Sequence, residues 1–99
     1  MGITVIVSFQ AKADKVDALL EFLTGLQPGV IEAGCQSITL LQDQGECDRI
    51  FEIEQWESAE QHQTMVQQAE AAGAFAPFAE LLADPFEVRY LHTVKASVR

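Results

Sequence analysis

The residues best suited to chemistry lie close together between Glu54 and His62. Glu54 comes two residues before Trp56, the only tryptophan, so both side chains are expected on the same side of one strand. His62 follows on a predicted helix, where it shares an apolar stripe with Val66 and should point inward. Burial lowers the pKa of a histidine, which keeps the imidazole neutral and able to accept a proton near pH 7. These residues could form a general-base site, although a core histidine bonded to Glu54 or to a backbone carbonyl explains the same pattern.

Large apolar side chains could enclose a flat substrate near this base. The side chains expected to line the space between sheet and helices are those of Phe9, Met65, Phe75, Phe78 and Tyr90. Trp56 could form one wall of the same pocket. Ordinary core packing accounts for all of these residues as well, with the indole N–H of Trp56 bonded inside the core.

The sequence lacks the motifs of other common metal, nucleotide and nucleophilic sites. Cys35 and Cys47 are twelve residues apart, which fits two reduced thiols rather than a C-x-x-C pair or a disulfide framework. Two cysteines and two histidines spread over the chain do not make a zinc site, which needs about four nearby ligands. Phosphate-binding glycine loops and the G-x-S-x-G element are also absent. We therefore expect neither a metal nor a cofactor.

Length and charge restrict the class of protein. The chain has 99 residues, a net charge of −9 and 48% apolar residues, which indicates one globular domain over residues 1–99 with a thin core. Six basic residues against fifteen acids leave no basic stripe for nucleic acid or an anionic membrane. Residues 43–60 hold seven acids, including Glu52 and Glu54, in a segment expected to be mostly solvated. No apolar run could span a bilayer and the first residues read as a strand, so the cytoplasm is the expected location.

Apolar periodicity predicts the elements that position these residues. Strands are expected at 3–9, 36–42, 48–55 and 86–94, where β-branched and apolar residues alternate with others. One helix is expected over 14–27, ended by Pro28-Gly29, and a short one over 75–82. Another begins at Ser58, which has capping-box spacing with Gln61. This order fits an α+β ferredoxin-like βαββαβ sandwich with an extra short helix and with both main helices on one face of the sheet.

The faces of the strands predict a second copy of the chain. The face expected to meet the helices is apolar and carries Ile3, Val5, Val7, Phe9, Phe86, Val88, Tyr90, His92 and Val94. The opposite face is half apolar and carries Thr4, Ile6, Ser8, Arg89, Leu91 and Thr93. Because a lone sheet more often shows a polar outer face, we expect two sheets to pack face to face in a homodimer. A monomer with a few exposed aliphatic residues is the alternative.

The spacing Glu54-x-Trp56-x-Ser58-x3-His62 resembles the E-x-W-x-[SD]-x3-H signature of the antibiotic biosynthesis monooxygenase family. Phe9-x-Ala11-Lys12-x3-Val16 looks like that family's passage from first strand to first helix, and the resemblance covers nearly the whole chain. It implies a dimeric α+β barrel made of two ferredoxin-like subunits. It also implies oxidation of a small quinol, phenol or polyketide-like aromatic by O₂ without metal or flavin. His62 would then assist deprotonation, while Trp56 and the phenylalanines would hold the ring.

Three functions follow as hypotheses. The first is a cofactor-independent monooxygenase that acts on a small aromatic substrate and O₂, with Glu54, Trp56 and His62 as catalytic residues. The second is a non-catalytic small-ligand-binding or stress-response dimer. The third is an isomerase or lyase that uses the same pocket. A fold by itself does not decide among them.

Overall fold

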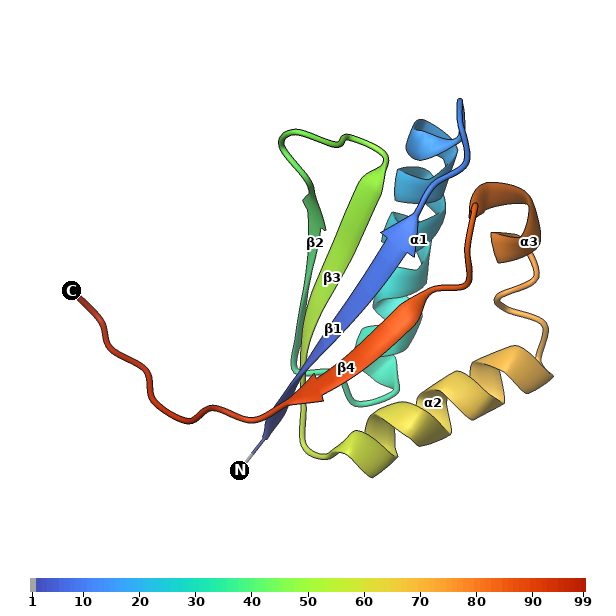
Figure 1. Ribbon diagram of the computed structural model, residues 1–99. Helices are drawn as coiled ribbons and strands as arrows, with labels where there is room; N and C mark the ends of the chain where they lie inside the picture. Colours follow the sequence, from blue (N-terminus) through green and yellow to red (C-terminus); the bar gives the residue numbers. More distant parts are fainter. Residues whose placement is uncertain (1) are drawn as a thin grey trace.

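A computed structural model describes residues 2–99 (Figure 1). The elements follow in the order β1 (Ile3–Gln10), α1 (Val16–Glu32), β2 (Ser37–Gln42), β3 (Arg49–Trp56), α2 (Ala59–Ala71), α3 (Phe78–Leu81) and β4 (Glu87–Leu91). Over these residues the strands form one antiparallel sheet in the order β2-β3-β1-β4. This is the predicted α+β ferredoxin-like arrangement, in which the two strand–helix–strand crossovers place β1 between β3 and β4.

Strand alternation decides which side chains face the helices. In β1 every second residue from Val5 to Phe9 is buried, and in β3 the same holds from Ile50 to Trp56. The register places Val5 between Tyr90 of β4 and Glu54 of β3 on this face. Leu19 and Leu23 of α1 join these side chains in the core. The inner face of the sheet is therefore apolar except where β3 contributes its glutamates.

The first helix is longer than the sequence predicts. α1 begins at Val16 and continues through Pro28 to Glu32, so the expected break at Pro28-Gly29 is wrong. Proline removes the hydrogen bond to the carbonyl four residues earlier, here that of Thr24. Both Thr24 and Pro28 are exposed, so water can solvate that carbonyl and the helix continues. The turn after α1 contains Gly34 at φ +123°, where a Cβ would collide with the amide of Gln61.

The last strand is shorter than predicted. β4 ends at Leu91, which pairs with Thr4 near the start of β1, so little of β1 remains to pair with later residues. His92 and Val94 are consequently exposed and lie outside the sheet, and Thr93 does not belong to its outer face. The C-terminal residues that follow β4 extend away from the body of the molecule (Figure 1). The third helix is also shorter, and only Phe78–Leu81 of the predicted 75–82 are helical.

The sheet face opposite the helices is half apolar, as predicted. Ile6 and Ile53 are partly exposed there, and Leu41 and Leu91 are 42% and 41% exposed. Within residues 2–99, none of the helices has the length and apolar content that crossing a bilayer requires.

Candidate functional site

The turn from β3 into α2 positions the histidine. Ser58 has extended backbone angles and its Oγ accepts a hydrogen bond from the Gln61 N–H at 3.2 Å, so the predicted cap is present. The Gln61 side chain returns to the backbone N–H of Glu57 at 3.3 Å, one residue before the position that a capping box uses. With the helix start fixed in this way, His62 in the first turn points toward the sheet and is 2% exposed.

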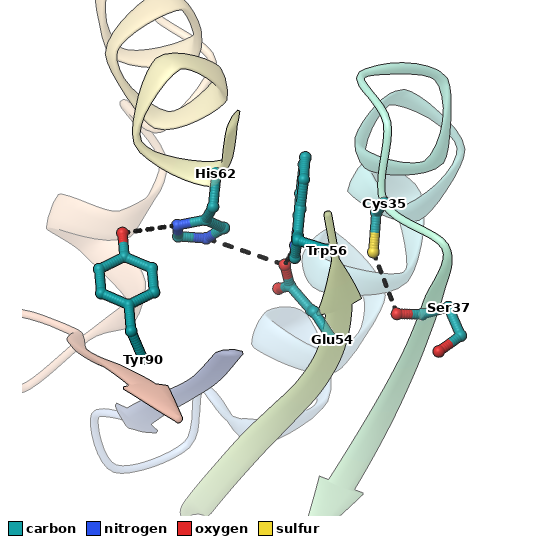
Figure 2. A network of polar contacts seen from close by, with 6 residues as sticks. All are labelled: Cys35, Ser37, Glu54, Trp56, His62 and Tyr90. Atoms are coloured by element: carbon teal, nitrogen blue, oxygen red, sulfur yellow. Dashed lines mark hydrogen bonds and ion pairs between the residues drawn. The ribbon is translucent and has the colours of Figure 1, made fainter. Parts of the chain in front are cut away.

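Glu54 is the centre of a buried polar network (Figure 2). Its Oε1 accepts a hydrogen bond of 2.7 Å from the indole N–H of Trp56. The Nε2 of His62 lies 3.8 Å from the same oxygen, which is too long for a direct hydrogen bond. On the other side of the imidazole, Nδ1 lies 2.9 Å from the hydroxyl oxygen of Tyr90. The network thus runs from the partly exposed Tyr90 to the buried carboxyl of Glu54.

Two carboxyl groups are buried in β3, not one. Glu52 is 7% exposed and Glu54 is 2% exposed. The expectation that the acids of residues 43–60 are mostly solvated is therefore wrong for these two. The reason is strand alternation, because Glu52 and Glu54 stand between Ile50 and Trp56 on the inward face.

Burial sets the protonation states of these groups. Desolvation lowers the pKa of His62, so its imidazole is neutral at pH 7. Desolvation, the charge of Glu54 and the hydrogen bond shared with Glu54 raise the pKa of Glu52 to about 8. Desolvation also raises the pKa of Glu54, while hydrogen bonds from Trp56 and Glu52 oppose that rise. Glu52 therefore keeps its proton at pH 7.

A cavity of about 40 Å³ lies between the sheet and the helices, beside these groups. Its polar lining comes from Glu52, Glu54 and His62, and its apolar lining from Val7, Phe9, Leu23, Leu26, Val30, Met65, Val66, Phe75, Phe78, Phe86 and Val88. The volume suits one or a few water molecules, whereas benzene binds in cavities of roughly 150 Å³. An aromatic ligand therefore requires side chains of this lining to move.

Three phenylalanines line both this cavity and a groove on the surface. Phe75, Phe78 and Phe86 line the inner cavity and also an outer groove of about 790 Å³. Their ring centroids lie 5.4–5.9 Å apart, so the rings pack directly on one another. Each ring is only partly buried. Displacement of this aromatic wall would join the groove to the carboxyl groups and the imidazole.

The sequence model of the antibiotic biosynthesis monooxygenase family matches residues 2–77. The chain belongs to this family. A Bordetella bronchiseptica protein that carries the family's name has the same fold, with a TM-score of 0.85 at 20% identity over 95% of this chain and 98% of its own. A Nitrosomonas europaea protein with that name has a TM-score of 0.81 at 18% identity, over 94% of this chain and 90% of its own. A second N. europaea protein, of unknown function, has a TM-score of 0.78 at 20% identity, over 99% of this chain and 94% of its own. No curated protein matches the chain.

In this family member, the structure brings together most of the residues singled out in the sequence. Those that line the inner cavity are Phe9, Glu54, His62, Met65, Phe75 and Phe78. Trp56 does not line it: the side chain is fully buried, as core packing predicts, and touches the site through Glu54. Tyr90 reaches the site through His62. The sequence analysis missed Glu52 as a site residue, although its spacing of two from Glu54 places both on one strand face.

The cysteines lie outside this site. Cys35 is buried and its Sγ donates to the carbonyl oxygen of Ser37 at 3.0 Å (Figure 2). Cys47 is exposed. Neither forms a disulfide. Across residues 2–99, no cluster of three His, Cys, Asp or Glu side chains is arranged to hold a metal ion.

Proposed function

We propose that the chain is a cofactor-independent monooxygenase that oxidises a small electron-rich aromatic with O₂, working as a homodimer. One observation carries the proposal: the neutral imidazole of His62 lies between Tyr90 and Glu54 and opens on an apolar cavity behind an aromatic wall. Membership of the antibiotic biosynthesis monooxygenase family supports this reaction class. The cytoplasmic location remains a prediction.

In this proposal His62 is the base. A hydroxyl group both donates and accepts, so Tyr90 can accept a hydrogen bond from Nδ1–H and leave Nε2, which points toward Glu54, as the acceptor (Figure 2). Nε2 takes the proton of a phenolic hydroxyl, and the resulting Nε2–H faces the carboxyl of Glu54 at 3.8 Å. The charge of a Glu54 carboxylate stabilises the imidazolium. Trp56 and Tyr90 act as positioning residues, because each touches the site through another side chain.

The aromatic substrate supplies the electrons. Loss of the hydroxyl proton makes the ring electron-rich enough to reduce O₂. A ring carbon that carries two hydrogens in the keto form becomes a carbonyl. The second oxygen atom leaves as water with the hydrogen that remained on this carbon and with the proton that His62 returns. The apolar lining excludes bulk water while this happens.

Oxygen uptake by the metal-free protein tests the proposal. A panel of quinols and hydroxyanthracenes is supplied to the wild type, to His62→Ala, to His62→Gln and to the control His92→Ala, whose side chain is exposed. We expect uptake above autoxidation in the wild type and the control, and a loss of at least about 10-fold in both His62 variants. Uptake no faster than autoxidation across the panel would overturn the proposal and favour the non-catalytic binding dimer. Uptake that persists without His62 would overturn its role as base.

The homodimer rests on the outer face of the sheet. That face exposes Leu41 and Leu91 beside Ile6 and Ile53, which together form a half-apolar surface without a covering helix. Light scattering should give twice the chain mass, and Leu91→Arg should shift it toward one copy, because a buried unpaired charge is costly. The control Ile31→Arg changes an equally exposed residue of α1 and should leave the mass unchanged. A wild type of single-chain mass at working concentration would contradict the dimer.

A further inference from the structure

The proposed base does not account for the pair of buried carboxyl groups. Glu52 and Glu54 stand two residues apart on the inner face of β3, and both line the cavity that His62 also lines. Across the sheet, Glu52 lies between apolar partners, Val7 of β1 and Leu40 of β2. Among the ion pairs of residues 2–99, none joins a lysine or arginine to either glutamate. The two carboxyl groups therefore have each other, and not a cation, as their main charged neighbours.

Two carboxyl groups in such a place hold one proton between them. Two adjacent negative charges in an apolar site repel each other and lack solvation, so the second ionisation is suppressed. Burial and the neighbouring charge of Glu54 raise the pKa of Glu52 to about 8, which places the shared proton on Glu52. The indole N–H of Trp56, at 2.7 Å, also favours charge on Glu54. A purely structural role explains this pair poorly, because burying two carboxyls costs free energy that an apolar pair would not.

We propose that Glu52 and Glu54 act together as acid and base in the keto–enol tautomerisation of a small neutral aromatic ketone. The aromatic character of this ligand rests on the proposed function above, whereas the proton transfers themselves need no oxygen. The pair presents a proton donor and a proton acceptor to one cavity, which is the arrangement that enolisation requires.

The step balances without an oxidant. Glu54 takes a proton from the carbon next to the carbonyl, and the electron pair of that C–H bond becomes the new C=C bond. Glu52 gives its proton to the carbonyl oxygen, whose π electrons form the new O–H bond. The pair then holds its one proton on Glu54 rather than on Glu52. A single proton transfer from Glu54 back to Glu52 restores the starting state.

The position of the pair also selects the ligand. A carboxylate-bearing or phosphorylated ligand would meet the charge of the pair without a nearby cation, whereas a neutral ketone would not. The aromatic ring of such a ketone would pack against Phe75, Phe78 and Phe86 in place of their contacts with one another as the ketone passes from the outer groove to the inner cavity. The enol that forms carries the hydroxyl proton that His62 then removes. Tautomerisation thus prepares the electron-rich form for oxygen.

Deuterium exchange under anaerobic conditions tests this pair. The probe is 2-tetralone in D₂O, and the readout is loss of its α-proton NMR signal with the wild type, Glu52→Gln, Glu54→Gln and the exposed control Glu60→Gln. We expect the wild type and the control to exchange at least about 10-fold faster than buffer, and each pair variant to lose most of that acceleration. Exchange at the buffer rate in the wild type, or acceleration that survives both pair substitutions, overturns the proposal.

An infrared spectrum gives a second readout that does not depend on turnover. We expect a protonated carboxyl band in the wild type and in Glu60→Gln at pH 7, and its loss in Glu52→Gln. Absence of the band in the wild type overturns proton sharing whether or not the variants fold. Anaerobic exchange without oxygen uptake would support the pair and overturn the monooxygenase, so the two failures are distinguishable.

Discussion

Replacing Glu52 with glutamine should change the pH dependence of stability in a defined direction. The folded state raises the pKa of Glu52 from 4.5 to about 8, so the folded protein holds a proton that the unfolded chain releases between these values. The contribution of this bound proton to the free energy of unfolding is fully present below pH 4.5 and is lost as the pH rises through 8. Since one pKa unit corresponds to about 1.4 kcal/mol, the upper limit of the loss is about 5 kcal/mol. We expect at least about 2 kcal/mol, because relaxation and water weaken the effect of burial.

Urea unfolding at pH 5, 6, 7 and 8, at one protein concentration, measures this loss. The free energy of unfolding of the wild type should fall relative to that of Glu52→Gln across the series, because glutamine has the same shape and cannot ionise. At pH 8 the variant should be the more stable protein. The exposed Glu60→Gln should follow the wild type at each pH. A difference between wild type and Glu52→Gln that stays constant from pH 5 to 8 would refute the reasoning.

Three further substitutions test separate contacts. Tyr90→Phe removes the 2.9 Å hydrogen bond to His62 Nδ1 and should cost about 1 kcal/mol in urea unfolding, with changed imidazole ¹⁵N shifts; unchanged shifts would contradict that contact. Ser58→Ala removes the acceptor for the Gln61 N–H and should cost about 1 kcal/mol, most of which Ser58→Asp should restore. Gly34→Ala puts a Cβ at φ +123° against the Gln61 side chain, and should cost about 1–3 kcal/mol and lower the Tm; equal melting temperatures would argue against strain at this turn.

Sequence periodicity was sufficient for the fold and for the orientation of His62. The stripe of α2 that contains His62 and the alternation of β1 both depend on local geometry, which repeats along one element. The same rule could have found Glu52, because it is two residues from Glu54. The high acid content of residues 43–60 predicted that Glu52 is exposed to solvent. This prediction was wrong because a count of charges does not consider which face of the strand a residue occupies.

Other features depend on contacts that no single element contains. Pro28 continues a helix because the carbonyl it leaves without a donor is exposed, a fact about packing rather than about proline. β4 ends at Leu91 because this residue pairs with Thr4, close to the first residue of β1, and little of β1 remains to pair with later residues. The aromatic wall brings Phe75 and Phe86 together from opposite sides of α3, and its position between groove and cavity could not be read from spacing.

The contrast between the two cysteines offers a native labelling site. Cys47 lies exposed in the β2–β3 connection, whereas Cys35 is buried and burial raises its pKa, which keeps it a thiol. A maleimide spin label should therefore attach once per chain, without any engineered cysteine. In an assembly of two copies the pair of labels would give one distance. That distance would report directly how the hairpin ends of the two sheets are placed relative to each other.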